Sequence, residues 1–366
     1  MLLERTATSP CLLPADGPSV GAELEVAFVD PLSNPQWDRW VRSHPDGSVF
    51  HTSAWAKILV KTYGHKPFYL RFSRGRQTVA LIPLMEVSSF LTGRRAVCVP
   101  FSDSCAPLIF DTDAAPAIME ALSRLASEKK WRHVELRGPV RTDGAAPSTE
   151  FLGHTLAITD DSEALFSRFS SANRGAIRKA QKSGVTSHIS TSRDAIRDFY
   201  RLHTVTRKRH GVPPQPLSFF LNIHEEIIKK GMGFVVTAWN DTTAIAANVY
   251  FRFADRAIYK FGASDTQYQH LRGSNAVMWK ALEFLAGSGV KALDFGRTSQ
   301  HNEGLRQYKL SWGASEETLA YYKFDTATRS WAISPDRASG IHNRVLSTLP
   351  VAFNRLAGAL IYPHLD

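Results

Sequence analysis

The sequence predicts a mixed α/β fold with mixed sheets, built from two tandem domains that repeat the same pattern. With 366 residues, the chain is longer than one ordinary hydrophobic core requires, so two domains are expected. Residues 121–138 and 281–297 both read as a helix followed by a short strand, and their apolar residues match. Upstream, residues 68–87 and 233–253 each read as two strands joined by a tight polar turn, the pattern of a β-hairpin. Each half therefore predicts a hairpin, a further strand, a helix and a strand.

Changes in composition divide the chain into five parts. Residues 1–22 lack an apolar run behind a basic start and predict a disordered leader, not a signal peptide. Residues 23–138 form the expected first domain, and residues 139–153, with their Pro, Gly and Ser content, form the expected linker. The second domain is expected over residues 154–325, and residues 326–366 form a C-terminal tail.

Three helices are predicted near the start of the second domain. Apolar residues at helical spacing indicate one helix from Ser162 to Ser183 and another from Asp194 to His210. The proline-rich loop over residues 211–216 cannot continue a helix, because each proline removes an N–H donor and clashes with the preceding turn. A third helix is expected from Leu217 to Lys230.

The composition restricts the class of protein and its surroundings. A hydrophobic content of 43% with 21% charged residues is typical of a globular protein. The three cysteines Cys11, Cys98 and Cys105 lack metal-type spacing, which favours a reducing compartment and predicts no metal site. No run approaches the roughly 18 apolar residues of a membrane-spanning helix, so a cytoplasmic location is expected, with a peripheral location at the inner membrane left open. The net charge of +10 favours anionic partners such as phosphates, RNA or anionic lipid, without choosing among them.

The first helix of the second domain carries a basic stripe. Arg174, Arg178 and Lys182 recur every four residues, and Asn173 begins the same segment. Like charges at this spacing oppose helix stability, so the stripe indicates a surface that contacts an anionic group. A solvated helix face is the alternative interpretation.

A loop that leads into a helix is the second candidate site. Arg272, Gly273, Ser274 and Asn275 lie where a helix is predicted to begin, at about Ser274. Helix N-termini bind phosphate through unpaired N–H groups and the helix dipole, and Arg272 adds a full charge. The alternative is an ordinary loop with an N-cap.

The third candidate site follows a predicted strand. Asp294 ends an apolar strand, Arg297 follows after Gly296, and Lys309 and Trp312 come after a polar loop. An acid and a base at a strand end of an open α/β sheet are typical of a site. Salt-bridge or capping roles for Asp294 and a core role for Trp312 are the alternatives.

Together these motifs resemble the FemAB-like branch of the GNAT superfamily, including the members found beside exosortase and exopolysaccharide loci. The resemblance depends on N-R-x-x-I-R-K-A-x-K-x-G (173–184), on Y-K-F-G-A-S-D (259–265) before L-R-G-S-N, and on L-D-F-G-R-(x)₁₁-K-(x)₂-W-G (293–313). It covers about residues 25 to 325 and implies two GNAT-like domains. The family's phosphate loop, (Gln/Arg)-x-x-Gly-x-(Gly/Ala), is matched incompletely, with His270 and Asn275 at its outer positions.

The resemblance implies an N-acyltransferase that transfers an acyl or aminoacyl group to an amine of a cell-envelope or exopolysaccharide-related acceptor. The donor implied is acyl-CoA or aminoacyl-tRNA, and no long charged insertion of the kind that binds tRNA is present. Asp294 is the implied general base, and Arg297 and Lys309 are implied to hold phosphate at the site. Tyr259 and Lys260 are implied to border the donor. The residues implied to line the acceptor cleft are Asn173, Arg174, Arg178, Lys182 and Trp312.

The tail and the partners leave alternatives open. Residues 341–365 place apolar residues at near-helical spacing, with a kink expected at Pro350 and Arg344 and Arg355 beside the stripe. Such a helix lies either on a membrane surface that carries lipid-linked acceptors or on its own protein. A non-catalytic binder of RNA or anionic glycan is the alternative function for the whole chain.

Overall fold

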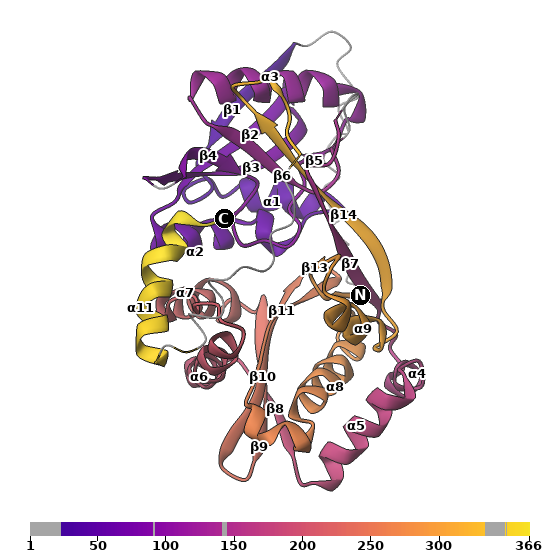
Figure 1. Ribbon diagram of the computed structural model, residues 1–366. Coiled ribbons are helices and arrows are strands. Elements are labelled where there is room, and N and C mark those ends of the chain that lie inside the picture. The colour runs from indigo at the N-terminus through magenta and orange to yellow at the C-terminus, as the bar shows by residue number, and fades with distance from the viewer. Residues whose placement is uncertain (1–22, 91, 141–144, 334–347, 349) are drawn as a thin grey trace, which may run out of the picture.

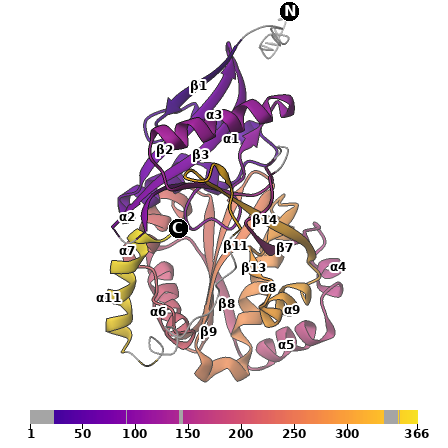
Figure 2. The same cartoon turned by 45° about the horizontal axis from the view of Figure 1, so that its top comes forward.

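The computed structural model describes residues 23–90, 92–140, 145–333, 348 and 350–366. The expected disordered leader over residues 1–22 lies outside them. Figures 1 and 2 show the N-terminal half of the chain above the C-terminal half, with strands passing between the two. Within the described residues, no helix is both long and apolar enough to cross a membrane.

The described strands belong to one mixed sheet whose order is nearly a mirror image of itself. That order is β1-β2-β3-β4-β6-β14-β7-β12-β11-β10-β9-β8, with three short strands at its margins. The strands of the first half are β1 (Leu24–Val29), β2 (Lys66–Arg74), β3 (Gln77–Ser89), β4 (Gly93–Val97), β5 (Leu108–Ile109) and β6 (His133–Arg137). The strands of the second half are β7 (Thr149–Ala157), β8 (Thr186–Ser190), β9 (Gly233–Asn240), β10 (Thr243–Phe253), β11 (Arg256–Ser264), β12 (Ala292–Asp294), β13 (Thr298–Ser299), β14 (Ser315–Asp325) and β15 (Ser330–Trp331).

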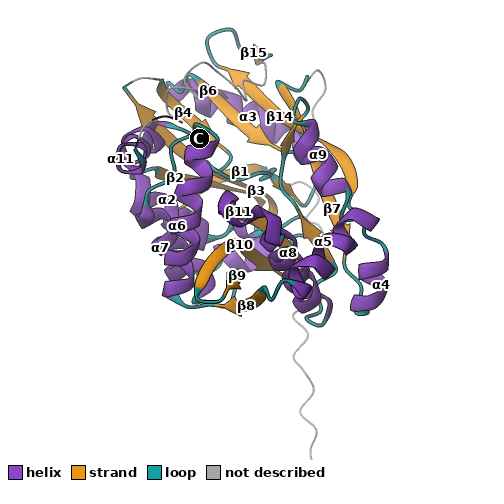
Figure 3. Ribbon diagram, turned by 60° about the horizontal axis from the view of Figure 1, so that its bottom comes forward, coloured by secondary structure: helices purple, strands orange, loops and turns teal. Residues whose placement is uncertain are grey.

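Helices cover the sheet in each half (Figure 3). Those of the first half are α1 (Trp37–Ser43), η1 (Val49–His51), α2 (Ser53–Tyr63), η2 (Thr112–Ala114) and α3 (Ala115–Glu128). Those of the second half are α4 (Ser162–Ser167), α5 (Ser171–Lys182), α6 (Arg193–Arg209), α7 (Leu217–Ile223), the π-helical turn η3 (His224–Ile228), η4 (Thr266–Leu271), α8 (Gly273–Ala286), α9 (Glu303–Leu310), α11 (Val351–Ile361) and η5 (Tyr362–His364).

The predicted internal repeat is confirmed by the sheet. The β2–β3 hairpin, β4, α3 and β6 correspond to the β9–β10 hairpin, β11, α8 and β12. In each half the strand before the long helix is parallel to the strand after it, and the hairpins are antiparallel. Gly75 and Asp241 have positive φ at the two hairpin turns, as tight turns between twisted strands require. The fold is therefore the duplicated α/β architecture that the sequence predicts.

Two central strands join the halves. β14 pairs with β6 of the first half, Tyr321 opposite Arg137, and on its other side with β7. The expected linker over residues 139–153 is therefore wrong in its last five residues, which are the start of β7. Phe151 in this segment is buried and its ring contacts Tyr321. The run of Pro, Gly and Ser ends before Thr149, where a strand with apolar residues begins.

The helix expected from Ser162 to Ser183 is two helices. α4 ends at Ser167, and Ser170 caps α5 by accepting a hydrogen bond from the Asn173 N–H. Serine is a strong N-cap residue, so it begins a new helix where helical spacing alone predicts continuity. The break places Phe169 in the core against Trp312.

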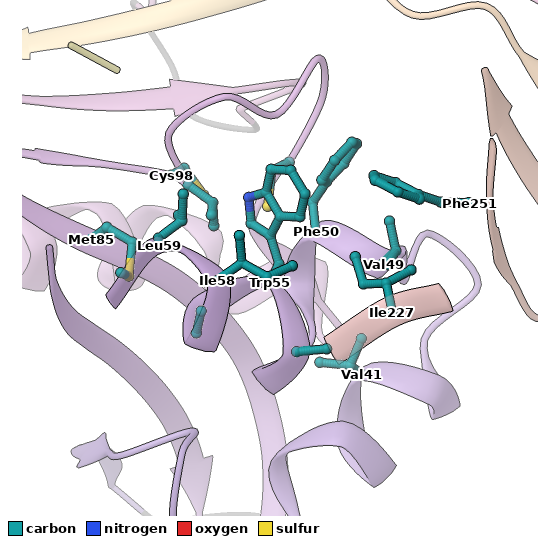
Figure 4. Close-up of a cluster of buried hydrophobic side chains, with 14 of the residues drawn as sticks. Val41, Val49, Phe50, Trp55, Ile58, Leu59, Met85, Cys98, Ile227 and Phe251 are labelled. Atoms are coloured by element: carbon teal, nitrogen blue, oxygen red, sulfur yellow. The ribbon is translucent and has the colours of Figure 1, made fainter. Parts of the chain in front are cut away.

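The halves also share a hydrophobic core (Figure 4). Trp55 of α2 lies between Phe50 of the first half and Phe251 of β10, with ring centroids 5.0 Å and 5.8 Å away. The Trp55 Nε1–H donates to the Pro100 carbonyl at 3.2 Å. Because large aromatic rings from both halves interlock, the two halves pack as one unit.

The tail packs against the second half through small and polar residues. α11 begins directly after Pro350, which is its N-cap, and residues 341–347 and 349 of the expected helix lie outside the described residues. Asn354 and Gly358 are buried, and a Cβ at Gly358 would lie 2.0 Å from the Pro214 carbonyl oxygen. The close approach of α11 to the loop before α7 thus requires glycine.

Gly358→Ala is expected to lower the free energy of unfolding by about 1–3 kcal/mol and to release α11, because the methyl group overlaps a backbone oxygen. Hydrogen exchange of the α11 amides measures the release. Gly287→Ala is the matched control, since its Cβ would meet no heavy atom within 4 Å. Unchanged protection of α11 in Gly358→Ala would contradict this packing.

Candidate active site between the two halves

The site begins where two parallel strands diverge. β11 and β12 pair over only three positions, the last being Ile258 opposite Asp294. β12 ends there, whereas β11 continues to Ser264. Gly296, at φ 70°, turns the chain away, and a Cβ on it would lie 3.1 Å from the carboxyl group of Asp103. Ligands of open α/β sheets bind in crevices beyond such strand ends, so this divergence locates the candidate site.

A cavity of about 660 Å³ lies between the two halves, against the paired residues of β11 and β12 up to Ile258 and Asp294. The first half contributes His44, Asp46, Ser48, His51, Asp103 and Ser104 to its walls, and the second half contributes Gly153, Thr155, Arg256, Asp294 and Glu317 among others. The volume is in the range of small-molecule sites. The first half thus takes part in the site.

Asp294 lies on the wall of the cavity and is half-buried. Its Oδ1 accepts a hydrogen bond from the Gly296 N–H at 2.7 Å. Burial raises the pKa of Asp294 to about 6, against the Gly296 hydrogen bond, and the charges of Asp103 and Glu317 add to the rise. A carboxyl group with this pKa accepts a proton more readily than an ordinary aspartate and is still ionised at pH 7.

Asp103 and Lys260 form a buried ion pair beside Asp294. The Lys260 Nζ lies 2.7 Å from the Asp103 Oδ2 and 5.0 Å from the centroid of the Phe50 ring. Burial opposes ionisation of Asp103, but Lys260, Arg297 and Lys309 together hold its pKa below the ordinary value. Burial lowers the pKa of Lys260 although its carboxylate partner opposes this shift.

Lys309 holds the turn after Asp294 in place through hydrogen bonds to its backbone. Its side chain is 2% exposed, and its Nζ donates to the carbonyls of Gly296 at 2.6 Å and Arg297 at 3.2 Å. Burial lowers the pKa of Lys309 to about 8. The ammonium group is bound to the backbone, so it fixes the turn that follows Asp294. Its charge lowers the pKa of both Asp294 and Asp103.

Arg297 is exposed and lies over two aromatic rings. Its guanidinium carbon is 4.6 Å from the centroid of Phe151 and 5.3 Å from that of Tyr321. The Tyr321 hydroxyl donates to the backbone carbonyl of Asp103 at 2.6 Å. Arg297 is therefore oriented by stacking, and its charge stays accessible to an anionic group.

The loop before α8 has the geometry of a helix N-terminus. Arg272 occupies the N-cap position with φ 59°, and Gly273 is buried, where a Cβ would lie 3.0 Å from the Ile245 side chain. The first N–H groups of the helix lack intrahelical acceptors. Asn275, however, donates its side-chain amide to Asn173 at 3.0 Å. Ser274 is exposed at the helix start.

Asn173 connects the three motifs that the sequence singles out. Besides the bond to Asn275 of α8, its amide donates to the Ser311 hydroxyl, beside Trp312, at 2.8 Å. Asn173 itself is buried in α5. Its contacts hold α5, the start of α8 and the end of α9 together.

The remaining residues of the predicted acceptor cleft lie outside the cavity wall as the described residues define it. Arg174 donates to the carbonyls of Ser167 and Phe169, Arg178 lies over the Phe166 ring at 5.6 Å, and Lys182 is exposed. Trp312 is fully buried. Their role in binding stays a prediction, and α5 presents its basic stripe to solvent.

Tyr259 and Lys260 lie just beyond the last β11–β12 pair, where the strands separate. The Tyr259 ring lies 6.1 Å from Phe295 and 5.5 Å from Tyr250, and burial raises its pKa well above the ordinary value. Both residues therefore border the space between the diverging strands, while Lys260 is already paired with Asp103.

Sequence analysis missed Asp103, Glu317 and Tyr321. Asp103 follows β4, the strand that corresponds to β11 in the repeat, so the duplication itself was the signal that could have found it. Glu317 lies opposite Gly153 in the β14–β7 pair. A Cβ added to Gly153 would lie 3.3 Å from the Glu317 Cγ. His154 and Glu316, one residue along each strand, point to the other face and pair at 3.0 Å.

Comparison with known proteins agrees with this geometry. Residues 167–310 match the family model of the acetyltransferase (GNAT) domain. Among solved structures, FemX is similar with 15% identity over 82% of this chain and 97% of that chain, at a TM-score of 0.67. A tandem GNAT protein from the clavulanic acid biosynthesis pathway is similar with 11% identity over 83% of this chain and 99% of that chain, at a TM-score of 0.54. L-PGS from Bacillus licheniformis is similar with 12% identity over 89% of this chain and 97% of that chain, at a TM-score of 0.52. No curated protein sequence matches the chain.

The matched domain contains β11, α8 and β12, whose divergence forms the candidate site. Residues 167–310 are therefore similar to an acetyltransferase (GNAT) domain. The whole chain shares its duplicated fold with FemX, along nearly the whole FemX chain, and with the tandem GNAT protein.

Proposed function

We propose that the protein transfers an acyl group from acyl-CoA, or an aminoacyl group, to an amine bound in the cavity between its halves. The acceptor proposed is a component of the cell envelope or of an exopolysaccharide, including lipid-linked forms. The observation that carries the proposal is the position of Asp294, a carboxylate with a raised pKa at the point where β11 and β12 diverge.

Asp294 suits the proton transfer that amide formation requires. The acceptor binds as an ammonium group and first loses one proton to water. The neutral amine nitrogen then attacks the thioester or ester carbonyl, a C–N bond forms, and the carbonyl π electrons move to the oxygen. The nitrogen proton passes to the Asp294 carboxylate, and collapse of the tetrahedral intermediate breaks the bond to the thiolate or alkoxide leaving group. The proton held by Asp294 then balances the leaving group directly or through water.

The walls of the cavity favour an amine. Asp46, Asp294 and Glu317 contribute carboxylates, and Arg256 contributes one guanidinium group. Asp103 is compensated by Lys260. Within the described part of the chain, Asp46 and Glu317 have no ion-pair partner, so a cationic ammonium group is the complementary ligand. This acidic lining contrasts with the net charge of +10 of the whole chain.

Lys309 and Arg297 have different parts in this proposal. Lys309 positions the Gly296–Arg297 turn and lowers the pKa of Asp294 through its charge. Arg297 is exposed and binds a phosphate of donor or acceptor. The phosphates of an acyl-CoA donor are proposed to lie at the α8 N-terminus with Arg272, and the acyl chain along the part of β11 that β12 leaves unpaired.

A transfer assay tests the proposal. Acetyl-CoA, longer acyl-CoAs and charged tRNAs are each combined with a panel of primary amines, including detergent-solubilised aminolipids and amino sugars, and amide products are measured by mass spectrometry. Product formation that Asp294→Asn abolishes supports the proposal, and sensitivity to RNase distinguishes tRNA from CoA donors. Salt-sensitive RNA binding without transfer from any donor would instead support a non-catalytic binder.

The reaction is expected to lose about tenfold in kcat/KM per pH unit below about pH 6, because protonation of Asp294 removes the base. Glu317→Gln is expected to move this acid limb to lower pH, since loss of a neighbouring negative charge lowers the pKa of Asp294. A pH–rate profile of both proteins measures the shift. An acid limb that stays in place in Glu317→Gln would contradict the assignment.

A further inference from the structure

α11 has small and polar residues on its buried face and large apolar residues on its exposed face. The buried positions are Asn354 and Gly358, one helical turn apart, whereas Phe353, Leu356 and Leu360 are 62%, 58% and 64% exposed. A helix that packs on its own protein normally turns its large apolar residues inward. Here the inward face is small and polar, and the outward face is the apolar one.

The apolar surface continues beyond the helix. Ile361 and Leu365 are 41% and 40% exposed, and Phe90, at the turn between β3 and β4, is 85% exposed. The Phe90 ring contacts His364 of η5 at a centroid distance of 4.7 Å, so this turn and the tail form one surface. Figures 1 and 3 show α11 on the outside of the molecule, beside α6 and α7. We call Phe90, Phe353, Leu356, Leu360, Ile361 and Leu365 the tail surface.

Basic groups lie next to the tail surface. The last turn of α6 consists of Arg207, Lys208 and Arg209, and Arg207 donates to the Tyr362 hydroxyl at 2.8 Å. Arg355 of α11 lies over the Tyr200 ring of α6 at 5.4 Å. α11 itself contains no acidic residue. Arg207 and Arg355 therefore lie where α6 meets the tail, and Lys208 and Arg209 follow in the same helical turn of α6.

We propose that the tail surface docks on a membrane that contains anionic lipid. An interfacial helix inserts large apolar side chains among the acyl chains, while flanking Arg and Lys groups meet lipid phosphates. The tail surface supplies the apolar side chains, and Arg207 and Arg355 supply cations beside them. A second copy of the chain is less suitable as the occupant, because two such surfaces would bring their arginine and lysine groups together. The proposal is independent of the reaction at Asp294.

The full chain is tested by co-sedimentation with vesicles of phosphatidylcholine alone and of about 70% phosphatidylcholine with about 30% phosphatidylglycerol. The wild type is expected to bind the anionic vesicles, less at high salt, and to bind neutral vesicles weakly. The double variant Leu356→Ser/Leu360→Ser is expected to lower binding at least about tenfold. Lys208→Gln/Arg209→Gln is expected to lower binding to the anionic vesicles only.

Phe28→Ser is the matched control, because Phe28 is 57% exposed on β1, at the far end of the first half (Figure 1). It is expected to bind vesicles as the wild type does. Equal loss of binding in Phe28→Ser and in the leucine variant would overturn the proposal. So would a wild type that ignores both vesicle types, or a dimer in analytical ultracentrifugation that the leucine variant dissociates while vesicle binding is absent.

Discussion

Asp294→Asn is expected to lower kcat/KM by a factor of about 10²–10⁴ and at the same time to stabilise the folded protein. The loss follows from removal of the base that takes the amine proton. The amide oxygen of Asn still accepts the Gly296 N–H bond, so the geometry of the turn is kept. Steady-state kinetics and thermal unfolding of the same two proteins measure both effects.

The sign of the stability change follows from the raised pKa. The pKa of Asp294 is about 6 in the folded protein and 3.8 ordinarily, so the unfolded chain binds fewer protons between these values. The contribution of Asp294 to stability therefore falls as pH rises from about 4 to 6, and the ionised group destabilises the protein at pH 7. Since the side chain is half-buried, Asn is expected to recover about 1–3 kcal/mol at pH 7 and little at pH 4.

Glu316→Gln is the matched control for this prediction. Glu316 is a carboxylate on the same sheet, but it points to the opposite face, where it pairs with His154 and Arg306. Its loss is expected to leave kcat within a few fold of the wild type and to destabilise, not stabilise, the protein. Reduced stability of Asp294→Asn at pH 7 with full activity would show that Asp294 is a structural residue.

The repeated pattern of hairpin, strand, helix and strand could be predicted because each element leaves a local signal. The β9–β10 hairpin, for example, has nearly continuous apolar runs on both sides of the polar turn at Asn240 and Asp241. The β14–β7 junction left no such signal, because the pairing of Tyr321 with Thr149 joins residues almost half the chain apart. The internal break at Ser170 was hidden by continuous helical spacing on both sides of it.

The site could be predicted only where one strand and its loop carry it. Asp294, Arg297 and Lys309 lie within one motif, and the structure brings them together around the turn at Gly296. Asp103 comes from the other half, so its proximity depends on how the halves pack. The sequence identifies Lys309 as a site residue but does not show that it is buried. In the structure its ammonium group is already bound to two backbone carbonyls.

Asp103→Asn is expected to destabilise the protein by about 3 kcal/mol, because it leaves the ammonium group of Lys260 buried without a carboxylate. The side chain of Lys260 is 6% exposed and that of Asp103 is 20% exposed. The pKa of Lys260 is lowered by burial even with its partner present, so the pair already exists at a desolvation cost. Chemical denaturation of the variant measures the loss.

The double variant Asp103→Asn/Lys260→Met distinguishes an ion pair from a merely well-packed pair. Removing both charges leaves no uncompensated ion, so the double variant is expected to regain most of the stability that Asp103→Asn loses. Asp103 also helps to raise the pKa of Asp294, so both variants are expected to shift the acid limb of the pH–rate profile to lower pH. Stability losses that simply add in the double variant would contradict the coupling. If the acid limb stays in place in both variants, Asp103 has no electrostatic influence on the base, and the contribution of the first half to the site is reduced to shape.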